Sequence, residues 1–180
     1  MTTNLDAFNM LKGFIGFTDK DAENLKALAP LFEAHGAAIT DAFYEKLLAE
    51  EEAAALIEGR VDQLKKTHAR WMGELFAGDY SDGYFDNRWR IGLAHVRVGV
   101  RPHWVEAVMS FLRAEGLKAM AGEIADIEAL TDRYASLVKV LDLDLMIINL
   151  AYGEERLERL SSFTGMSRKL LERCVTQAKK

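Results

Sequence analysis

The sequence predicts an all-α protein, and three observations lead to this prediction. Apolar residues recur three and four residues apart along most of the 180-residue chain, which is the spacing of helices with one buried face. No stretch shows the alternation of Val, Ile and Thr with polar residues that marks a half-buried strand. The chain contains only two prolines, so long helices can form between them. A chain of this length is expected to form one domain around a single core.

The first two helices are predicted in the N-terminal third of the chain. Thr18 is a suitable N-cap, and Asp21 stands three residues later, as in a capping box. Pro30 is expected to interrupt or end the helix that starts there, because proline lacks the backbone N–H and clashes with the preceding turn. A second helix is predicted over residues 36–49, and Gly59 then breaks the chain.

Further helices are predicted in the rest of the chain. They cover residues 61–76, 81–99, 102–122 and 127–160. Gly78 is expected to stop the first of them, and Pro102 suits the first position of the third. The breaks at Pro30 and Pro102 favour crossed helices over a simple up-and-down bundle. Residues 1–160 are assigned to one domain, and residues 161–180 to a short helix or a linker.

The composition argues against several classes of protein. A net charge of -5, with basic residues scattered among acidic ones, argues against nucleic-acid binding. The single cysteine, Cys174, rules out a disulfide framework and a Cys-x-x-Cys-His haem attachment, and it fits a reducing cytoplasm. Residues 1–10 lack the pattern of a signal peptide, and the most apolar run, residues 145–152, is too short to span a bilayer. We therefore expect a cytoplasmic protein that binds no nucleic acid and no membrane.

His95 is the histidine with the most informative neighbours. On a helix with about 100° per residue, Ile91, Gly92 and Val98 all fall within about 60° of it. Glycine in a helix interior costs about 1 kcal/mol relative to alanine, so Gly92 needs an explanation. One explanation is a flat cofactor that presses against this face and is bound by the histidine. The other is close packing of two helices beside a buried histidine, and geometry alone leaves both open.

A family resemblance is carried chiefly by residues 91–104, which read Ile-Gly-Leu-Ala-His-Val-Arg-Val-Gly-Val-Arg-Pro-His-Trp. This segment closely resembles the proximal-histidine segment of globin-coupled sensors and single-domain sensor globins. Residues 14–48 and 75–80 resemble the N-terminal portion of that family and its joint between the distal and proximal helices. The resemblance covers residues 14–160 in the family's order. It implies a globin fold that lacks the short helix before the distal helix, and one b-type haem.

The resemblance also implies roles for individual residues. His95 becomes the proximal ligand of the haem iron, in keeping with the single proximal histidine of globins. Its other ring nitrogen needs an acceptor, and a backbone carbonyl one turn back, near Ile91, is expected to serve. Tyr44 matches the family's distal tyrosine, which hydrogen-bonds a bound ligand; the alternative is a core aromatic. The other residues expected around the haem are Phe43, Leu64, Ile91, Gly92, Val98 and Trp104.

His68 lies on the predicted distal helix. It shares a face with the apolar residue Trp71 and is expected to point inward, while Thr67 lies about 100° away, at the edge of that face. Three roles are open. His68 is a sixth iron ligand, or His68 or Thr67 is a second hydrogen-bonding group for the gas, or His68 is buried and structural.

The resemblance implies a haem-based sensor that binds a diatomic gas reversibly, with oxygen favoured over carbon monoxide and nitric oxide. The last two long helices are apolar on more than one side, which indicates a partner, and the family dimerises through these helices. We therefore expect a homodimer. In the family a methyl-accepting, kinase or cyclase domain often follows the globin. Residues 161–180 are too short for such an output domain, so the output is expected from an absent module or another protein.

Two other classes of function stay open. A haem oxidoreductase, such as a nitric oxide dioxygenase or a peroxide scavenger, would need an external electron donor, because the sequence holds no reductase domain. A haem-free helical dimer would act as an interaction module. A visible absorption spectrum separates this last class from the other two.

Overall fold

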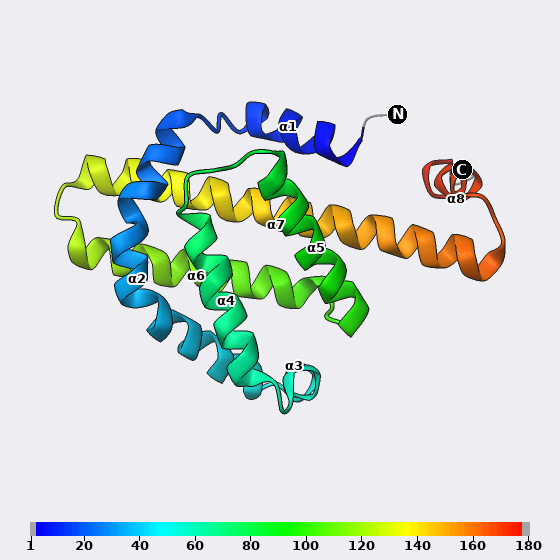
Figure 1. Cartoon of the computed structure of the whole chain (residues 1–180), viewed down its shortest axis with the longest axis horizontal. Coiled ribbons are helices and arrows are strands. Elements are labelled where there is room, and N and C mark those ends of the chain that lie inside the picture. Colours follow the sequence, from blue (N-terminus) through cyan, green and yellow to red (C-terminus); the bar gives the residue numbers. More distant parts are fainter. Residues whose placement is uncertain (1–2, 178–180) are drawn as a thin grey trace.

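The computed structural model describes residues 3–177 and confirms the all-α prediction (Figure 1). Within these residues it contains eight α-helices and no strand. Their bounds are α1 Asn4–Phe14, α2 Asp19–Leu48, α3 Glu51–Ile57, α4 Val61–Leu75, α5 Asp82–Val98, α6 Pro102–Glu123, α7 Ile127–Thr164 and α8 Arg168–Thr176. None of these described helices is long and apolar enough to cross a membrane.

Helix α2 begins as predicted but does not stop where it was expected to. The Asp21 side chain accepts a hydrogen bond from the Thr18 backbone N–H at 2.8 Å, which closes the predicted capping box. The prediction that Pro30 interrupts or ends the helix is wrong, because α2 continues through it to Leu48. Pro30 lies on the exposed side of α2, so the carbonyl that loses its partner there can bind water.

A short helix, α3, lies directly before α4, where the resemblance implied none. Its sequence explains it. Three consecutive alanines, residues 53–55, have the highest helix propensity, and Glu51 and Glu52 place negative charge in the first turn. The chain then turns at Gly59, whose φ of 70° lies in the left-handed region that glycine adopts without strain. The predicted break at Gly59 is confirmed.

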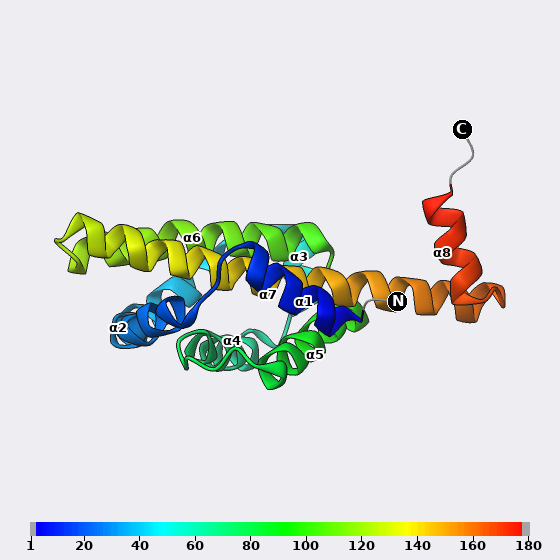
Figure 2. The same ribbon diagram turned by 90° about the horizontal axis from the view of Figure 1, so that it is seen from above.

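The helices form two crossed layers. Helices α6 and α7 lie side by side in one layer, and α2, α4 and α5 cross the other side (Figures 1 and 2). Helix α4 has extensive contacts with α2, and α5 has extensive contacts with α7. Helices α4 and α5 run apart from their common connection and make few contacts or none with each other (Figure 1). The crossed arrangement that the sequence predicted is therefore confirmed.

Gly92 is explained by close packing of helices. A Cβ atom at this position would lie 2.7 Å from Cβ of Ala151 and 3.1 Å from Cα of Ile148, both on α7. The room that Gly92 leaves is thus filled by α7, which supports the packing explanation; a contact of Gly92 with a cofactor stays a prediction. The same face of α5 carries Tyr84 and Arg88, which are buried and turn toward α7 as well.

The C-terminal part of the chain differs slightly from the prediction. Helix α7 runs past residue 160 to Thr164, and Gly165 ends it with a φ of 69°. Helix α8 then packs back on α7, where Leu171 is buried and Arg168 forms an ion pair with Glu154. A short helix in this segment was one of the two expectations. The division into domains at residue 160 stays a prediction.

Candidate functional site

His95 lies in the last turn of α5 and is held by its own helix. Its Nδ1 lies 2.8 Å from the carbonyl oxygen of Ile91, the acceptor expected from the sequence. A carbonyl can only accept, so Nδ1 carries the proton and Nε2 keeps its lone pair. Burial lowers the pKa of His95, although the bond to Ile91 opposes this shift. His95 is therefore a neutral imidazole with Nε2 available to a metal ion.

An aromatic cluster forms where α2 packs on α4. The His68 ring centroid lies 4.6 Å from that of Phe43 and 5.0 Å from that of Trp71, and the Tyr44 ring is 6.5 Å away. The predicted inward direction of His68 is thus confirmed. Burial lowers the pKa of His68 to about 4, so this imidazole is neutral near pH 7. Its Nε2 is buried and has no hydrogen-bond partner among the described residues.

Thr40 is a residue of this cluster that the sequence analysis missed. Its hydroxyl oxygen lies 2.9 Å from Nδ1 of His68, which orients the ring. Thr40 stands four residues before Tyr44 and three before Phe43, on the same face of α2. That spacing was the available signal, but a single threonine in a helix rarely attracts notice.

Tyr44 is buried beside His68, and its hydroxyl has no hydrogen-bond partner within residues 3–177. Burial raises the pKa of Tyr44 to about 12, so the phenol keeps its proton at physiological pH. A protonated phenol with no protein partner can donate a hydrogen bond to a bound molecule.

The other predicted residues divide into two groups. Leu64, Ile91 and Trp104 are half-buried, and Nε1 of Trp104 is buried without a partner in the described chain. Thr67 and Val98 point outward. Thr67 is exposed and donates to the carbonyl of Gln63, which does not favour a distal role, and that role stays a prediction. Val98 is 45 % exposed on the last turn of α5.

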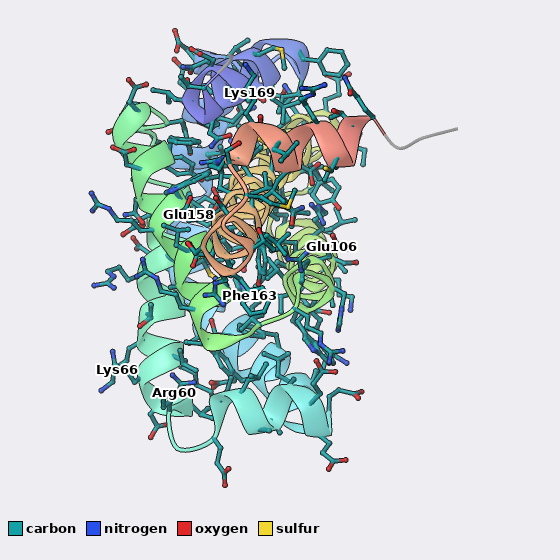
Figure 3. The ribbon with its side chains drawn as sticks, turned by 90° about the vertical axis from the view of Figure 1, so that its right-hand side faces the viewer. Arg60, Lys66, Glu106, Glu158, Phe163 and Lys169 are labelled. Atoms are coloured by element: carbon teal, nitrogen blue, oxygen red, sulfur yellow. The ribbon has the colours of Figure 1, made fainter. Side chains whose placement is uncertain are left out.

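The outer side of α4 is polar and faces solvent. Lys66, the neighbour of Thr67, projects away from the body of the protein (Figure 3). Successive residues of a helix are about 100° apart, so Thr67 lies outside the buried face of α4 on which His68 lies.

A buried polar network joins α4, α5 and α7. Asp144 on α7 has an exposed fraction of 0 % and accepts hydrogen bonds from Trp71 Nε1 at 2.8 Å, from Arg88 Nε at 2.9 Å and from the Tyr84 hydroxyl. The fully buried guanidinium of Arg88 also pairs with Glu74 of α4. A buried carboxylate is tolerated only when donors surround it. In the sequence, Asp144 is one of two acidic residues in an apolar stretch, and nothing there indicates its partners.

The residues present fit a haem. The chain supplies a neutral imidazole on α5 with its Nε2 lone pair available, and a second imidazole on α4 whose buried Nε2 has no partner among the described residues. Buried polar atoms without partners are rare in proteins, and a group bound between the helices would satisfy them. The crossed helices and this pair of histidines together define a globin.

The comparison with known families agrees with this class. The Protoglobin family model matches residues 4–158, and the chain belongs to that family. The resemblance to sensor globins found in the sequence is therefore confirmed.

Individual relatives are similar along most of the chain. A solved structure, the globin domain of the Geobacter sulfurreducens globin-coupled sensor, has 36% sequence identity and a TM-score of 0.77, covering 80% of this chain and 96% of that one. The globin domain of E. coli DosC has 16% identity and a TM-score of 0.67, over 79% of this chain and 97% of that one, and it supports the fold alone. The heme-based aerotactic transducer HemAT of Halobacterium salinarum is 29% identical over 161 residues, which are 81% of this chain. The chain spans 33% of the length of that transducer.

Proposed function

We propose that this protein is a haem-based gas sensor that binds a diatomic ligand reversibly, with oxygen as its main ligand. The observation that carries the proposal is the neutral His95, whose Nδ1 is fixed by the Ile91 carbonyl and whose Nε2 is left for iron. The names of its relatives, a globin-coupled sensor and an aerotactic transducer, support the same function.

His95 would hold one b-type haem as the proximal ligand. Phe43, Leu64 and Ile91 would contribute apolar contacts, and the unpartnered Nε1 of Trp104 would donate a hydrogen bond to the cofactor. The haem supplies an iron that binds diatomic gases. Tyr44 and His68 would then act on the gas, Tyr44 through its protonated hydroxyl and His68 through Nε2, which has no partner among the described residues.

A purely structural role for His68 is disfavoured. A structural histidine would have both ring nitrogens satisfied, whereas its buried Nε2 has no partner among the described residues. Two roles remain for His68, as sixth iron ligand and as hydrogen-bond donor to the gas.

Oxygen release tests the function and the role of Tyr44 together. Oxygen held on the distal side gains negative charge, so the Tyr44 phenol would donate a charge-assisted hydrogen bond to it. Such a bond contributes about 1.5–3 kcal/mol, so Tyr44→Phe should speed oxygen release about tenfold to about a hundredfold. Carbon monoxide carries little charge when bound, and its release should hardly change. Stopped-flow dissociation of both gases from the ferrous protein measures these rates.

The outcomes of this experiment are distinct. A wild-type chain that forms no reversible oxygen complex would refute the sensor function, and steady turnover with an added reductant would favour the haem oxidoreductase. A normal oxygen complex with equal off-rates in both proteins would refute only the role of Tyr44.

We also propose that the chain acts as a homodimer that passes the signal to an output domain or protein. Most apolar residues of α7 are used by the core of the chain itself, but Leu145, Met146 and Leu150 are only half-buried. With Asp142 and Asn149 they line a shallow pocket on the outer face of α7. Phe163, nearer the C-terminal end of α7, is 90% exposed (Figure 3). Such an apolar surface is typical of an interface.

Sedimentation velocity tests the dimer. The wild-type chain should sediment as a dimer at micromolar concentration, and Met146→Asp should give monomers because it adds a charge beside Asp142 in an apolar contact. Lys169→Asp on α8, away from this pocket, is the control and should remain dimeric. A monomeric wild type at tens of micromolar, a concentration well above the dissociation constants of stable dimers, would contradict the proposal.

A further inference from the structure

The two half-buried histidines, His68 and His95, differ in the kind of group that lies against Nδ1. Nδ1 of His95 faces a backbone carbonyl, which can only accept a hydrogen bond. Nδ1 of His68 faces the hydroxyl of Thr40 at 2.9 Å, and a hydroxyl can donate or accept. The carbonyl therefore fixes one tautomer of His95, whereas Thr40 is compatible with both tautomers of His68.

The Thr40 hydroxyl is not engaged by its own helix. Four other threonines in the described helices donate to the carbonyl four residues before them. They are Thr67, Thr131, Thr164 and Thr176. Thr40 makes no such bond and is 4% exposed, so His68 is the only partner of its hydroxyl among the described residues. The hydroxyl proton is free to turn toward or away from Nδ1 without any movement of the heavier atoms.

We propose that Thr40 is a positioning residue that lets His68 alternate between two tautomers. When Nδ1 carries the proton, Thr40 accepts it as a hydrogen bond, and the lone pair of Nε2 is available to iron. When Thr40 donates to Nδ1, Nε2 carries the proton and donates to the gas. This inference rests on the proposed haem and gas binding, and it joins the two roles of His68 into one exchangeable ligand.

The expected effect follows from the loss of one buried hydrogen bond in each state. Thr40→Val keeps the shape of the side chain and removes the hydroxyl, so the His68 ring loses the bond that orients Nε2 for either role. The net contribution of one hydrogen bond changes an equilibrium constant about twofold to about tenfold. In the ferric protein the ratio of low-spin to high-spin haem should fall by that factor, and in the ferrous protein oxygen release should become faster by a similar factor. Thr40→Ser, which keeps a hydroxyl, should stay close to wild type in both measurements.

The experiment uses the purified full chain and two readouts. Absorption and electron paramagnetic resonance spectra give the spin state, and stopped-flow mixing gives the oxygen off-rate. Thr131→Val is the matched control, because Thr131 is exposed and donates to the carbonyl of Ile127 in its own helix. It should change neither readout. Nitrogen-15 spectra of the histidines in wild type give a third measurement that needs no variant. His68 should show Nδ1–H in the low-spin ferrous protein without gas, and Nε2–H after carbon monoxide is added.

The failures can be told apart. A wild-type chain without haem or without an oxygen complex would overturn the proposed function. A wild type with both, accompanied by a Thr40→Val variant unchanged in either readout, would overturn the role of Thr40. If Thr40→Val does not fold, the nitrogen-15 spectra of the wild type decide. The same tautomer of His68 with and without gas would overturn the role of Thr40.

Discussion

Replacing His95 with alanine is expected to remove haem from the purified protein or leave it bound weakly. Loss of a partner that merely orients a metal ligand lowers metal affinity about 10–100-fold, so loss of the ligand itself should lower it more. The haem content of the variant, measured from its absorption per chain, should therefore fall at least about tenfold.

His103→Ala is the control for this experiment. His103 is exposed at the start of α6, eight residues along the chain from His95, and should keep its full haem content. Imidazole added to His95→Gly should restore part of the haem binding, because it replaces the missing ligand in the space that the side chain leaves. A His95→Ala protein with full haem and an unchanged spectrum would show that another residue holds the iron.

The second large effect is expected on stability, at Asp144. Replacing it with asparagine leaves the buried guanidinium of Arg88 with Glu74 as its one remaining carboxylate partner among the described residues. It also turns an amide donor either toward the Tyr84 hydroxyl or toward Trp71 and Arg88. Removal of one partner of a buried ion pair costs about 3–5 kcal/mol in the free energy of unfolding. The total free energy of unfolding of a typical domain is only about 5–15 kcal/mol. Urea denaturation followed by circular dichroism should show this loss in Asp144→Asn.

Asp142→Asn provides the matched control on the same helix. Asp142 pairs with Arg113 at the surface, and exposed ion pairs are worth about 0–1 kcal/mol. The double variant Arg88→Met with Asp144→Leu should recover part of the lost stability, because it removes both buried charges together. Equal stability of Asp144→Asn and Asp142→Asn would mean that the network does not hold the helices.

The fold was predictable wherever local rules decide it. The N-cap at Thr18 and the break at Gly59 depend on neighbouring residues and were found from the sequence. Pro30 was misjudged because the local rule ignores the side of the helix on which the proline lies, and the exposed side tolerates it. Helix α1 was missed although Leu5, Phe8 and Leu11 stand at helical spacing, and Phe8 is buried by packing against Phe85 of α5.

The site was predictable in its local part only. The bond from His95 to the Ile91 carbonyl spans one helical turn, so the sequence determines it. The partners of His68 and Asp144 come from positions 28 and 56 residues or more away in the chain, such as Thr40 and Arg88. Pairs at such separations depend on how whole helices cross, which periodicity does not reveal. Gly92 illustrates the same limit, because its close contact with α7 could not be distinguished from contact with a cofactor.

The Asp144 network also fixes the distance between helices α4 and α5. Helices α4 and α5 have few contacts or none with each other, yet both are bound to the same carboxylate on α7 through Trp71 and Arg88. Asp144 thus acts as a spacer that fixes their separation by side-chain lengths. A separation that is fixed in advance reduces the entropy lost when a rigid planar molecule enters between the helices. The planar molecule is then bound more tightly, because less of its binding free energy is offset by the cost of separating α4 and α5.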